Sequence, residues 1–568
     1  MRRHSFLISS ALLLACAAAS PRDARADDAA PPATPSEPQA PADVTAAQPQ
    51  AAADAVAPAE PLAPPAAARD LCLGEPAPRA LGPAPAARLA GEAESYKPFA
   101  HLALGSRCME LSLPVSLAGR LESVSRFPLD RYGTTFGGPS ASPEVRLGAR
   151  FSSGMQWAPF ALLGEAEVDL VTGIDARAAG VDGQGYPGSE GLETQLRKLH
   201  ARASLANLLH LDVGAQTSHF GMGLISNDGA HGWQPGSTSF TDPRGGDRVL
   251  RAQLSTGPHT PLALALSLGA DKVLGDDTLL AGDSARQFFG ALVAGHGKPN
   301  SAGVFVVRRH QENADGRATD VTLIDATAKG TLEISGAVLG LETEWALVKG
   351  TTDLGASVEH VQHDVLELGG AARASLDAGM LGAVLDFLYA SGDQNPYDHA
   401  QNAFHADPNY AFGLLLFRQV MAAQSARTTA TAADPQLSAT PAQDLERVPT
   451  RGSATNTVAI FPKVRFRPLA GLEVYAGPLF AFANVPNTDP FNTQLAGGSP
   501  RSPLGGDAGR YLATELDLGV RYRAIVFGSE VTLGAEGGVL SPGSAFRALD
   551  DSKMGAVYGG RGTLRYRF

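Results

Sequence analysis

The residues best suited to bind charged molecules lie at the end of the sequence. In the last stretch, GRGTLRYRF, Arg561, Arg565 and Arg567 occupy alternate positions, and Tyr566 and Phe568 belong to the other register. Successive side chains of a β-strand point to opposite faces, so one face carries three guanidinium groups and the other is apolar and aromatic. Rows of arginine and lysine favour anions over cations.

The same period of two residues recurs along the chain, with charged residues on one face of each run. PFALLGEAEVDLVTG, VLGLETEWALV, FPKVRFR and RYLATELDLGVRYR all alternate apolar and ionic residues. We call the cations in the last third of the chain the basic wall: Lys463, Arg465, Arg467, Arg521, Arg523, Arg561, Arg565 and Arg567. The carboxylates on the ionic faces are Glu165, Glu167, Asp169, Glu342, Glu344, Glu515 and Asp517. Since Glu165, Glu167 and Asp169 come from an early strand, we expect them to form an acidic wall opposite the basic wall.

Two kinds of β structure have strands with one ionic face and one apolar face. In a soluble antiparallel sandwich the apolar face is the core, and in a membrane barrel it meets lipid while the ionic face lines a wet lumen. Soluble strands typically have about five to six residues, whereas these runs often reach about ten. Their apolar faces are rich in Ala, Gly and Leu, which would leave cavities in a core but not on a lipid-facing surface. The sequence therefore predicts an all-β fold, a transmembrane antiparallel β-barrel without helices.

Turn-rich segments of very unequal length separate the predicted strands. TGPHTP (256–261) is typical of a short periplasmic turn, whereas residues 173–191, 221–247 and 422–455 form long loops. Loops beyond about 15 residues are unusual in compact domains, but outer-membrane barrels have short turns on one side and long loops on the other. The spacing predicts about 16–18 strands.

The start of the chain predicts export from the cytoplasm. Arg2 and Arg3 precede the apolar run FLISSALLLACAAA, and ARA at 24–26 is a small-x-small cleavage site, so residues 1–26 are predicted to be a signal peptide. LLAC at 13–16 supports a competing interpretation as a lipobox, in which Cys16 becomes the lipidated N-terminus. No later run of about 20 apolar residues predicts a membrane-spanning helix.

Residues 27–95 consist mostly of Ala, Pro, Asp, Glu and Gln, and few of them are apolar and branched or aromatic. Such a segment buries too little surface to offset its ordering entropy, so we expect a disordered Ala/Pro-rich linker before a barrel that spans 96–568. In an oxidising compartment Cys72 and Cys108 either form a disulfide at the entrance to the barrel or remain two free buried thiols.

Composition and motifs argue against several other functions. The formal net charge of −12 argues against nucleic acid as the main partner. The sequence contains neither Gly-x-Ser-x-Gly nor His-Glu-x-x-His, so it predicts no enzyme and no cofactor.

Two motifs resemble metal sites, and we predict no metal at either. EHVQHD would place His360 and His363 on one face only if it were helical, and its surroundings predict a strand. SGDQNPYD offers Asp393, Asn395 and Asp398 as calcium ligands, but these are also ordinary turn-forming residues.

Two stretches resemble known outer-membrane barrels. FLYASGDQNPYDHAQNAFHADPNY (387–410) resembles the ASGD-x-NP-x-D segment of alginate-export-type barrels, which follows a strand and opens an external loop. GMGLISNDG and the later GGDRV, within 221–249, resemble a group of uncharacterised myxobacterial outer-membrane barrels. The resemblance implies a large monomeric barrel and, for the alginate-export relatives, passage of an anionic polysaccharide. The interleaved carboxylates depart from the continuous arginine belt that a polyanion would require.

These observations predict a porin-like channel of the cell outer membrane for small hydrophilic or anionic solutes, with the basic wall as the selecting element. Tyr566 and Phe568 resemble the C-terminal signature that outer-membrane barrels present to the barrel insertion machinery. They also fall where an interfacial aromatic girdle would contact outer-membrane lipid. The alternatives are a closed structural or surface-display barrel that acts through its long loops, with its charges paired, and a lipid-tethered soluble β-sandwich.

Overall fold

The computed structural model describes residues 100–103, 109–154, 160–175, 192–205, 208–229, 246–258, 260–356, 360–395, 398–437, 443–469 and 471–568. The predicted signal peptide, the predicted linker, Cys16, Cys72 and Cys108 lie outside these residues.

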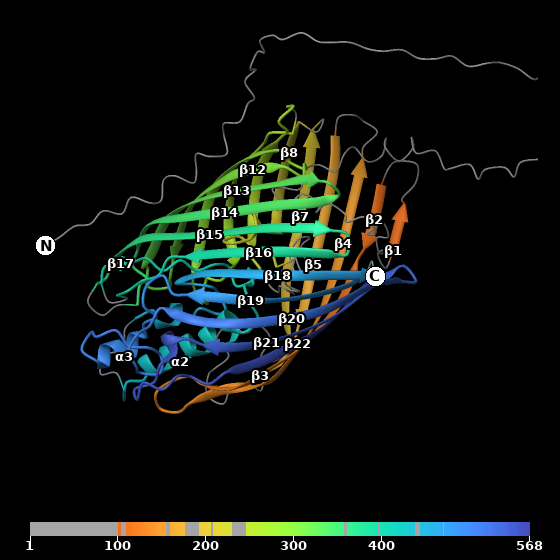
Figure 1. The fold of residues 1–568 in the computed structure, drawn as a ribbon. Helices are drawn as coiled ribbons and strands as arrows, with labels where there is room; N and C mark the ends of the chain where they lie inside the picture. The colour runs from red at the N-terminus through yellow and green to blue at the C-terminus, as the bar shows by residue number, and fades with distance from the viewer. Residues whose placement is uncertain are drawn as a thin grey trace, which may run out of the picture. The chain divides into compact units, whose positions relative to one another are not determined.

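Eighteen strands close into an antiparallel β-barrel, because the last strand, β22, pairs with β3 along Ser116–Val124 (Figure 1). This confirms the predicted fold class at the upper end of the predicted strand count. The barrel strands are β3 (Val115–Pro128), β4 (Thr135–Gly154), β5 (Phe160–Val171), β7 (Glu193–Leu205), β8 (Leu209–Thr217), β9 (Arg248–Thr256), β10 (Ala265–Gly275), β11 (Ser284–Ala294), β12 (Ser301–Glu312), β13 (Ala318–Ile334), β14 (Ala337–Thr352), β15 (His363–Ala378), β16 (Leu381–Ala390), β18 (Thr457–Leu469), β19 (Leu472–Phe482), β20 (Tyr511–Val526), β21 (Ser529–Pro542) and β22 (Val557–Arg567). Four short strands extend the sheet: β1 (Ala100–Ala103), β2 (Met109–Leu113), β6 (Ile174–Asp175) and β17 (Ala400–Gln401).

The two ends of the barrel differ in the length of their connections. At the end where Phe568 lies beside Val115, which we call the terminus end, two-residue turns connect β13 to β14, β15 to β16 and β20 to β21. Ser335 and Gly336 both have positive φ, as the tight turn of a hairpin requires. The predicted turn at 256–261 also lies at this end, between β9 and β10.

Long connections occupy the opposite end, which we call the loop end. They are residues 172–192, 218–247, 391–456, 483–510 and 543–556, and they contain the three predicted long loops. The predicted asymmetry between short turns and long loops is therefore confirmed.

Alternate residues of each strand face outward and inward. On β10, Leu266 and Leu268 are exposed on the outside, whereas Ser267 and Asp271 are buried on the inside. The other strands repeat this pattern, so a belt of exposed Leu, Val, Ile and aromatic side chains surrounds a polar interior. An outward apolar belt around a polar lumen is the surface of a membrane-spanning barrel.

The prediction of a chain without helices is wrong. Residues 416–432 form a π-helical turn, η1 (Leu416–Met421), which runs into α2 (Ala422–Ala432), and α3 (Pro490–Leu495) lies in the next long loop. Figure 1 shows α2 and α3 at the end of the barrel opposite the C-terminus. The α2 sequence AAQSARTTATA is rich in Ala, the strongest helix former, and has no period of two. None of the helices in the described ranges is long and apolar enough to cross a membrane.

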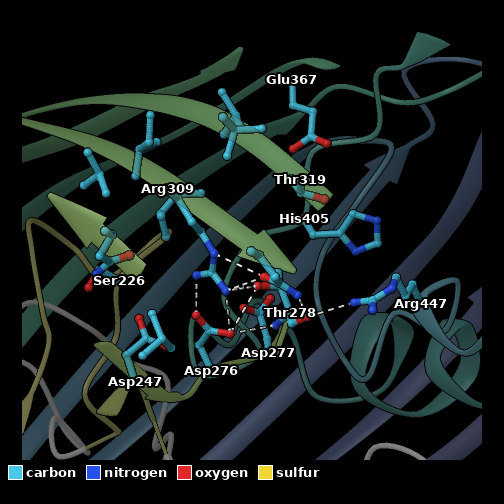
Figure 2. Close-up of a pocket in the computed structure, with 18 of the residues that line it drawn as sticks. Ser226, Asp247, Asp276, Asp277, Thr278, Arg309, Thr319, Glu367, His405 and Arg447 are labelled. Atoms are coloured by element: carbon cyan, nitrogen blue, oxygen red, sulfur yellow. Dashed lines mark hydrogen bonds and ion pairs between the residues drawn. The ribbon is translucent and has the colours of Figure 1, made fainter. Parts of the chain in front are cut away.

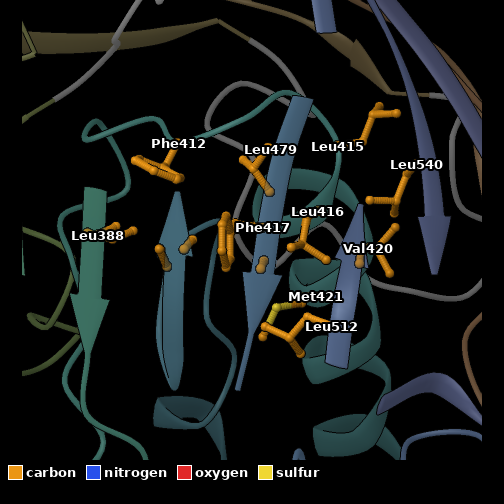
Figure 3. Close-up of a cluster of buried hydrophobic side chains, with 14 of the residues drawn as sticks. Leu388, Phe412, Leu415, Leu416, Phe417, Val420, Met421, Leu479, Leu512 and Leu540 are labelled. Atoms are coloured by element: carbon orange, nitrogen blue, oxygen red, sulfur yellow. The ribbon is translucent and has the colours of Figure 1, made fainter. Parts of the chain in front are cut away.

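The helical segment folds into the barrel lumen rather than away from it. Leu415, Leu416, Phe417, Val420 and Met421 pack against inward side chains of the wall in one buried cluster (Figure 3). The wall residues in that figure are Leu388 from β16, Leu479 from β19, Leu512 from β20 and Leu540 from β21. Inward apolar residues near the loop end therefore form a local core that holds this loop inside the barrel.

Candidate functional site

The basic wall faces the lumen as the alternation predicts, and its charges are matched by carboxylates of neighbouring strands. Lys463, Arg465 and Arg467 alternate on β18 with the outward-facing residues Ile460, Val464 and Phe466. The ion pairs of the wall are Lys463 with Asp386 (2.6 Å), Arg465 with Asp377, Arg467 with Glu473 (3.0 Å), Arg521 with Glu473 (3.8 Å), Arg523 with Glu530 (2.6 Å), Arg561 with Glu536 (2.5 Å) and Arg567 with Glu530 (3.5 Å). Arg565 lies on the same inward face of β22.

The predicted acidic wall does not lie opposite the basic wall. Strand β5, which carries Glu165, Glu167 and Asp169, is separated from β22 by only β3 and β4. Its carboxylates form ion pairs with cations of the adjacent strands: Glu165 with Arg150 (3.4 Å), Glu167 with Arg197 (2.7 Å) and Asp169 with Arg146 (2.6 Å). The sequence showed which face each charge occupies but not which strands become neighbours on closing the barrel.

Glu515 anchors the inward-folded helical segment to the barrel wall. One carboxylate oxygen accepts hydrogen bonds from the backbone N–H groups of Leu414 (2.6 Å) and Leu415 (2.7 Å), and the other accepts one from Leu416 (2.9 Å). A carboxylate suits this place, because the first N–H groups of a helix have no partner within the helix. Asp517 is buried on the same face of β20.

Glu344 anchors a second inward loop in the same way. Its carboxylate accepts hydrogen bonds from the backbone N–H groups of Met222 and Leu224 (3.0 Å for Leu224), within the long loop between β8 and β9. Glu342 faces inward two residues earlier on β14. The alternation of the strands predicts that Glu344 and Glu515 face the lumen, but it does not predict that they bind loop backbone.

A cavity of about 310 Å³ lies between the inward loops and the wall formed by β9 to β15. Its charged and polar lining comes from strand ends and loops: Asp247, Asp276, Asp277, Thr278, Gln287, Arg309, Gln311, Glu367, His405, Arg447 and Arg451. Figure 2 shows Asp276, Asp277 and Thr278 gathered beside Arg309, with Arg447 reaching the same group from the other side.

Each of two arginines in the cavity is held by a carboxylate. Arg309 contacts Asp276 at 2.5 Å, and Arg447 contacts Asp283 at 2.9 Å. Arg451 instead donates to the backbone carbonyls of Asp277 and Glu446, both at 2.8 Å. Two of the three guanidinium charges are therefore already neutralised by the protein.

The remaining carboxylates give the cavity a surplus of acidic groups. No cation of the described residues contacts the carboxylate of Asp247, Asp277 or Glu367 within ion-pair distance. Burial, with the charge of Asp276 beside it, raises the pKa of Asp277 to about 7. Burial and the charge of Asp407 likewise raise the pKa of Asp247 well above its usual value. These shifts arise because several carboxylates share one poorly hydrated space with too few cations.

Two other ionisable groups of the cavity, Asp276 and His405, have pKa values below their ordinary values. Burial opposes ionisation of Asp276, but the Arg309 charge and its hydrogen bond hold the Asp276 pKa below the ordinary value. Burial, together with the charge of Arg451, lowers the pKa of His405 to about 4, so this imidazole is neutral at physiological pH.

A second cavity of about 250 Å³ lies next to the first and shares five lining residues with it, Leu354, Gln401, His405, Arg447 and Thr450. It is bounded by polar side chains of α2 and by the loop that carries α3. Asp489 caps α3 by accepting a hydrogen bond from Asn492 N–H at 2.7 Å, and burial raises its pKa to about 6. The second cavity therefore gives the pair of cavities a polar lining next to the inward helix α2.

Of the two motifs that resemble metal sites, SGDQNPYD contributes Asp393 to the lining of the second cavity. Among the described residues no three His, Cys, Asp or Glu side chains are placed to hold a metal ion, and His360 and His363 have ring centroids 6.4 Å apart. Asp393 accepts hydrogen bonds from two backbone N–H groups, one of them Asn395 at 2.9 Å, as a turn former does. This motif follows β16 and opens the loop at 391–456.

The chain end forms part of the barrel seam. The Tyr566 and Phe568 ring centroids are 5.0 Å apart, in the register that faces away from the lumen. Phe568 exchanges backbone hydrogen bonds with Val115 at 2.6 and 2.9 Å.

The cavity residues could not be selected from the sequence. Asp276 and Asp277 lie in a stretch rich in Gly and Asp that is typical of a turn, and Arg309 is one of many strand cations. Asp247 belongs to GGDRV, a stretch that indicates a resemblance but no cavity. Only the closure of the barrel and the inward folding of the loop at 391–456 bring them together.

No protein-family model and no curated protein sequence matches the chain. Among solved structures, it is similar to the Pseudomonas aeruginosa outer membrane protein OpdK, with a TM-score of 0.45 and 10% identity over 80% of this chain and 99% of that one. It is also similar to P. aeruginosa OpdQ, with a TM-score of 0.46 and 12% identity over 81% of this chain and 98% of that one. A third similar structure is P. aeruginosa OccK2 (OpdF) in complex with glucuronate, with a TM-score of 0.45 and 12% identity over 80% and 98% of the two chains.

Proposed function

We propose that the protein is a porin-like channel of the cell outer membrane that passes small hydrophilic solutes. The observation that carries this proposal is the pair of adjoining polar cavities inside a closed barrel of eighteen strands with an apolar outer belt. Barrels of about 16–18 strands are wide enough to leave an aqueous channel, and a loop folded inward narrows it to a selective size. Outer-membrane lipid and the barrel insertion machinery are the partners that such a barrel implies.

The selecting element in this proposal is the cavity rather than the basic wall. The cations of the basic wall are matched by carboxylates at short distances, so their fields largely cancel in the lumen. In the cavity, by contrast, no cation of the described part of the chain contacts Asp247, Asp277 or Glu367, and Arg451 donates to backbone carbonyls. Carboxylates in a narrow part of a channel favour cations. We therefore expect solutes that carry a positive charge to pass more readily than anions.

The predicted preference for anions is the second candidate. It is favoured by the number of cations that face the lumen on β18, β20 and β22, and by the resemblance of 387–410 to alginate-export barrels. An anionic polysaccharide would have to displace carboxylates from their ion pairs with the basic wall. A closed structural or surface-display barrel is the alternative in which the inward loops block passage altogether.

The test is single-channel conductance of the refolded protein in a planar bilayer, with the reversal potential measured across a salt gradient. We expect steady conductance and a reversal potential of the sign for cation preference. Replacing both Asp247 and Asp277 with Asn should remove most of that preference, and Asp550→Asn, an exposed carboxylate at the same end of the barrel, is the matched control.

Each outcome separates two of the hypotheses. Anion preference that Arg465→Glu together with Arg521→Glu inverts would transfer selection back to the basic wall. Absence of conductance from protein that shows heat-modifiable migration, and is therefore folded, would refute the channel and leave the long loops as the functional part.

A further inference from the structure

Charged residues on the outside of the barrel gather on one arc, strands β10 to β14, near the loop end. Lys272, Arg286, Arg308, His310 and Lys349 occupy the same outward register as exposed apolar residues of their own strands. On β12, for example, exposed Val304, Val306 and Arg308 alternate with buried Phe305 and Val307.

The strand register places these cations in two adjacent rows of outward-facing residues. We call a row of residues that pair side by side across neighbouring strands a rung. On one rung Lys272 is paired with Arg286, and Arg286 with His310. On the next rung toward the terminus end, Arg308 and Lys349 both flank Thr322.

The rung below these two is entirely apolar or glycine. It consists of Leu268, Gly290, Val306, Ile324, Leu347 and Leu368, which follow one another in register from β10 to β15. The cations therefore border the apolar belt directly, at the level where lipid headgroups lie. Phe288, 68% exposed, lies beside Arg308 on the boundary, where barrels carry an aromatic girdle.

The protein does not neutralise most of this positive charge. Arg308 and His310 share Asp320, each at 3.2 Å, and His310 also lies 4.0 Å from Glu312, but no described residue pairs with the side chain of Lys272, Arg286 or Lys349. Like charges directly opposite each other on neighbouring strands are destabilising, so the pair formed by Lys272 and Arg286 is unfavourable unless an anion lies between them.

We propose that Lys272, Arg286, Arg308 and Lys349 form a site on the outer wall that binds the phosphate groups of a lipid in the leaflet at the loop end. Neighbouring strands lie about 4.8 Å apart, so the cations from β10 to β14 span about 19 Å, enough for a headgroup with two phosphates. The apolar rung below them receives the acyl chains. This site requires the barrel to lie in a membrane, as proposed above, but it does not require the lumen to conduct.

The test measures binding of a lipid A with two phosphates to the refolded barrel in zwitterionic detergent, by native mass spectrometry and thermal unfolding. The comparison ligands are the same lipid without its phosphates and inorganic phosphate. Replacing both Lys272 and Arg286 with Gln should weaken binding about 30-fold, which corresponds to about 2 kcal/mol for two cations near a membrane surface. Arg126→Gln, an exposed cation of β3 outside the arc, is the matched control and should bind as the wild type does.

The proposal is supported if the phosphorylated lipid stabilises the wild type and the control but not the double variant. It is overturned if the double variant binds equally well, if the dephosphorylated lipid binds as tightly, or if inorganic phosphate gives the same stabilisation. Should the double variant fail to fold, Lys349→Gln gives the same decision with an expected loss of about fivefold. Conductance of the variants reports on the channel separately, because none of these residues faces the lumen.

Discussion

Replacing Glu515 with Gln should weaken the attachment of the inward helical segment to the barrel wall. One oxygen of Glu515 accepts hydrogen bonds from Leu414 and Leu415 N–H, and the other from Leu416 N–H. The amide oxygen of Gln can keep the first two bonds, but its NH₂ group would face the Leu416 N–H, which is also a donor. The substitution keeps the size of the side chain and changes only the charge and one acceptor.

The magnitude follows from these three bonds. Hydrogen bonds to a charged group contribute about 1.5–3 kcal/mol and neutral ones about 0.5–1.5 kcal/mol, so two weakened bonds and one lost bond amount to about 4 kcal/mol. This corresponds to roughly a thousandfold increase in the population with the segment undocked. The apolar contacts of Phe417 and Val420 with the wall remain, so the segment stays folded into the lumen most of the time.

Hydrogen exchange measures this population directly. Gln419 and Val420 N–H both donate to the Leu415 carbonyl, at 3.0 Å, and exchange only when the segment opens. Their exchange should accelerate by roughly a thousandfold in Glu515→Gln. The control is Glu473→Gln, which removes a lumen carboxylate that contacts the basic wall. It should leave the exchange rates of Gln419 and Val420 N–H unchanged. Unchanged exchange in Glu515→Gln would refute the anchor.

Three further predictions concern the second anchor, the cavity and the seam. Glu344→Gln should accelerate hydrogen exchange at Leu224 N–H by about 30-fold or more, because a hydrogen bond to a charged acceptor contributes about 2 kcal/mol. An exchange rate equal to that of the wild type would contradict this prediction. Because the pKa of Asp277 is about 7, its negative charge is lost below pH 7 and gained above it, so cation preference in bilayer recordings should rise between pH 5.5 and pH 8.5. The rise should be smaller in Asp277→Asn, and an equal rise would contradict this assignment. Phe568→Ala should reduce the fraction of protein that assembles into the folded, heat-modifiable barrel, since the aromatic pair with Tyr566 is lost. An unchanged fraction would refute a role of Phe568 in barrel assembly.

The alternation of residue types was sufficient to predict the barrel and the faces of its strands. The residues of the basic wall, and the carboxylates grouped with them, lie on inward registers. Successive side chains of a strand point to opposite faces, so the face of each residue follows once the strand is identified. The positions of turns and long loops followed from Gly, Pro and Asp clusters for the same local reason.

The arrangement inside the lumen could not be predicted, because it depends on contacts between distant parts of the chain. Arg317 pairs with Asp444 across 127 residues, and Glu344 binds a loop 122 residues earlier. The sequence does not reveal the helix at 422–432, because a segment rich in Ala, Thr and Pro favours an external loop. The apolar residues just before it, 415–421, become a core only when Leu479, Leu512 and Leu540 provide an inward wall for them.

Both anchors recognise main chain rather than side chains. The loops donate to Glu344 and Glu515 through backbone N–H groups, so the identities of Met222, Leu224 and Leu414 are not read by the carboxylates. The loops can therefore diverge in sequence while the wall continues to hold them, provided that consecutive N–H groups remain free. A barrel built in this way can accept exchanged loops, and with them a new solute range, without redesign of its strands.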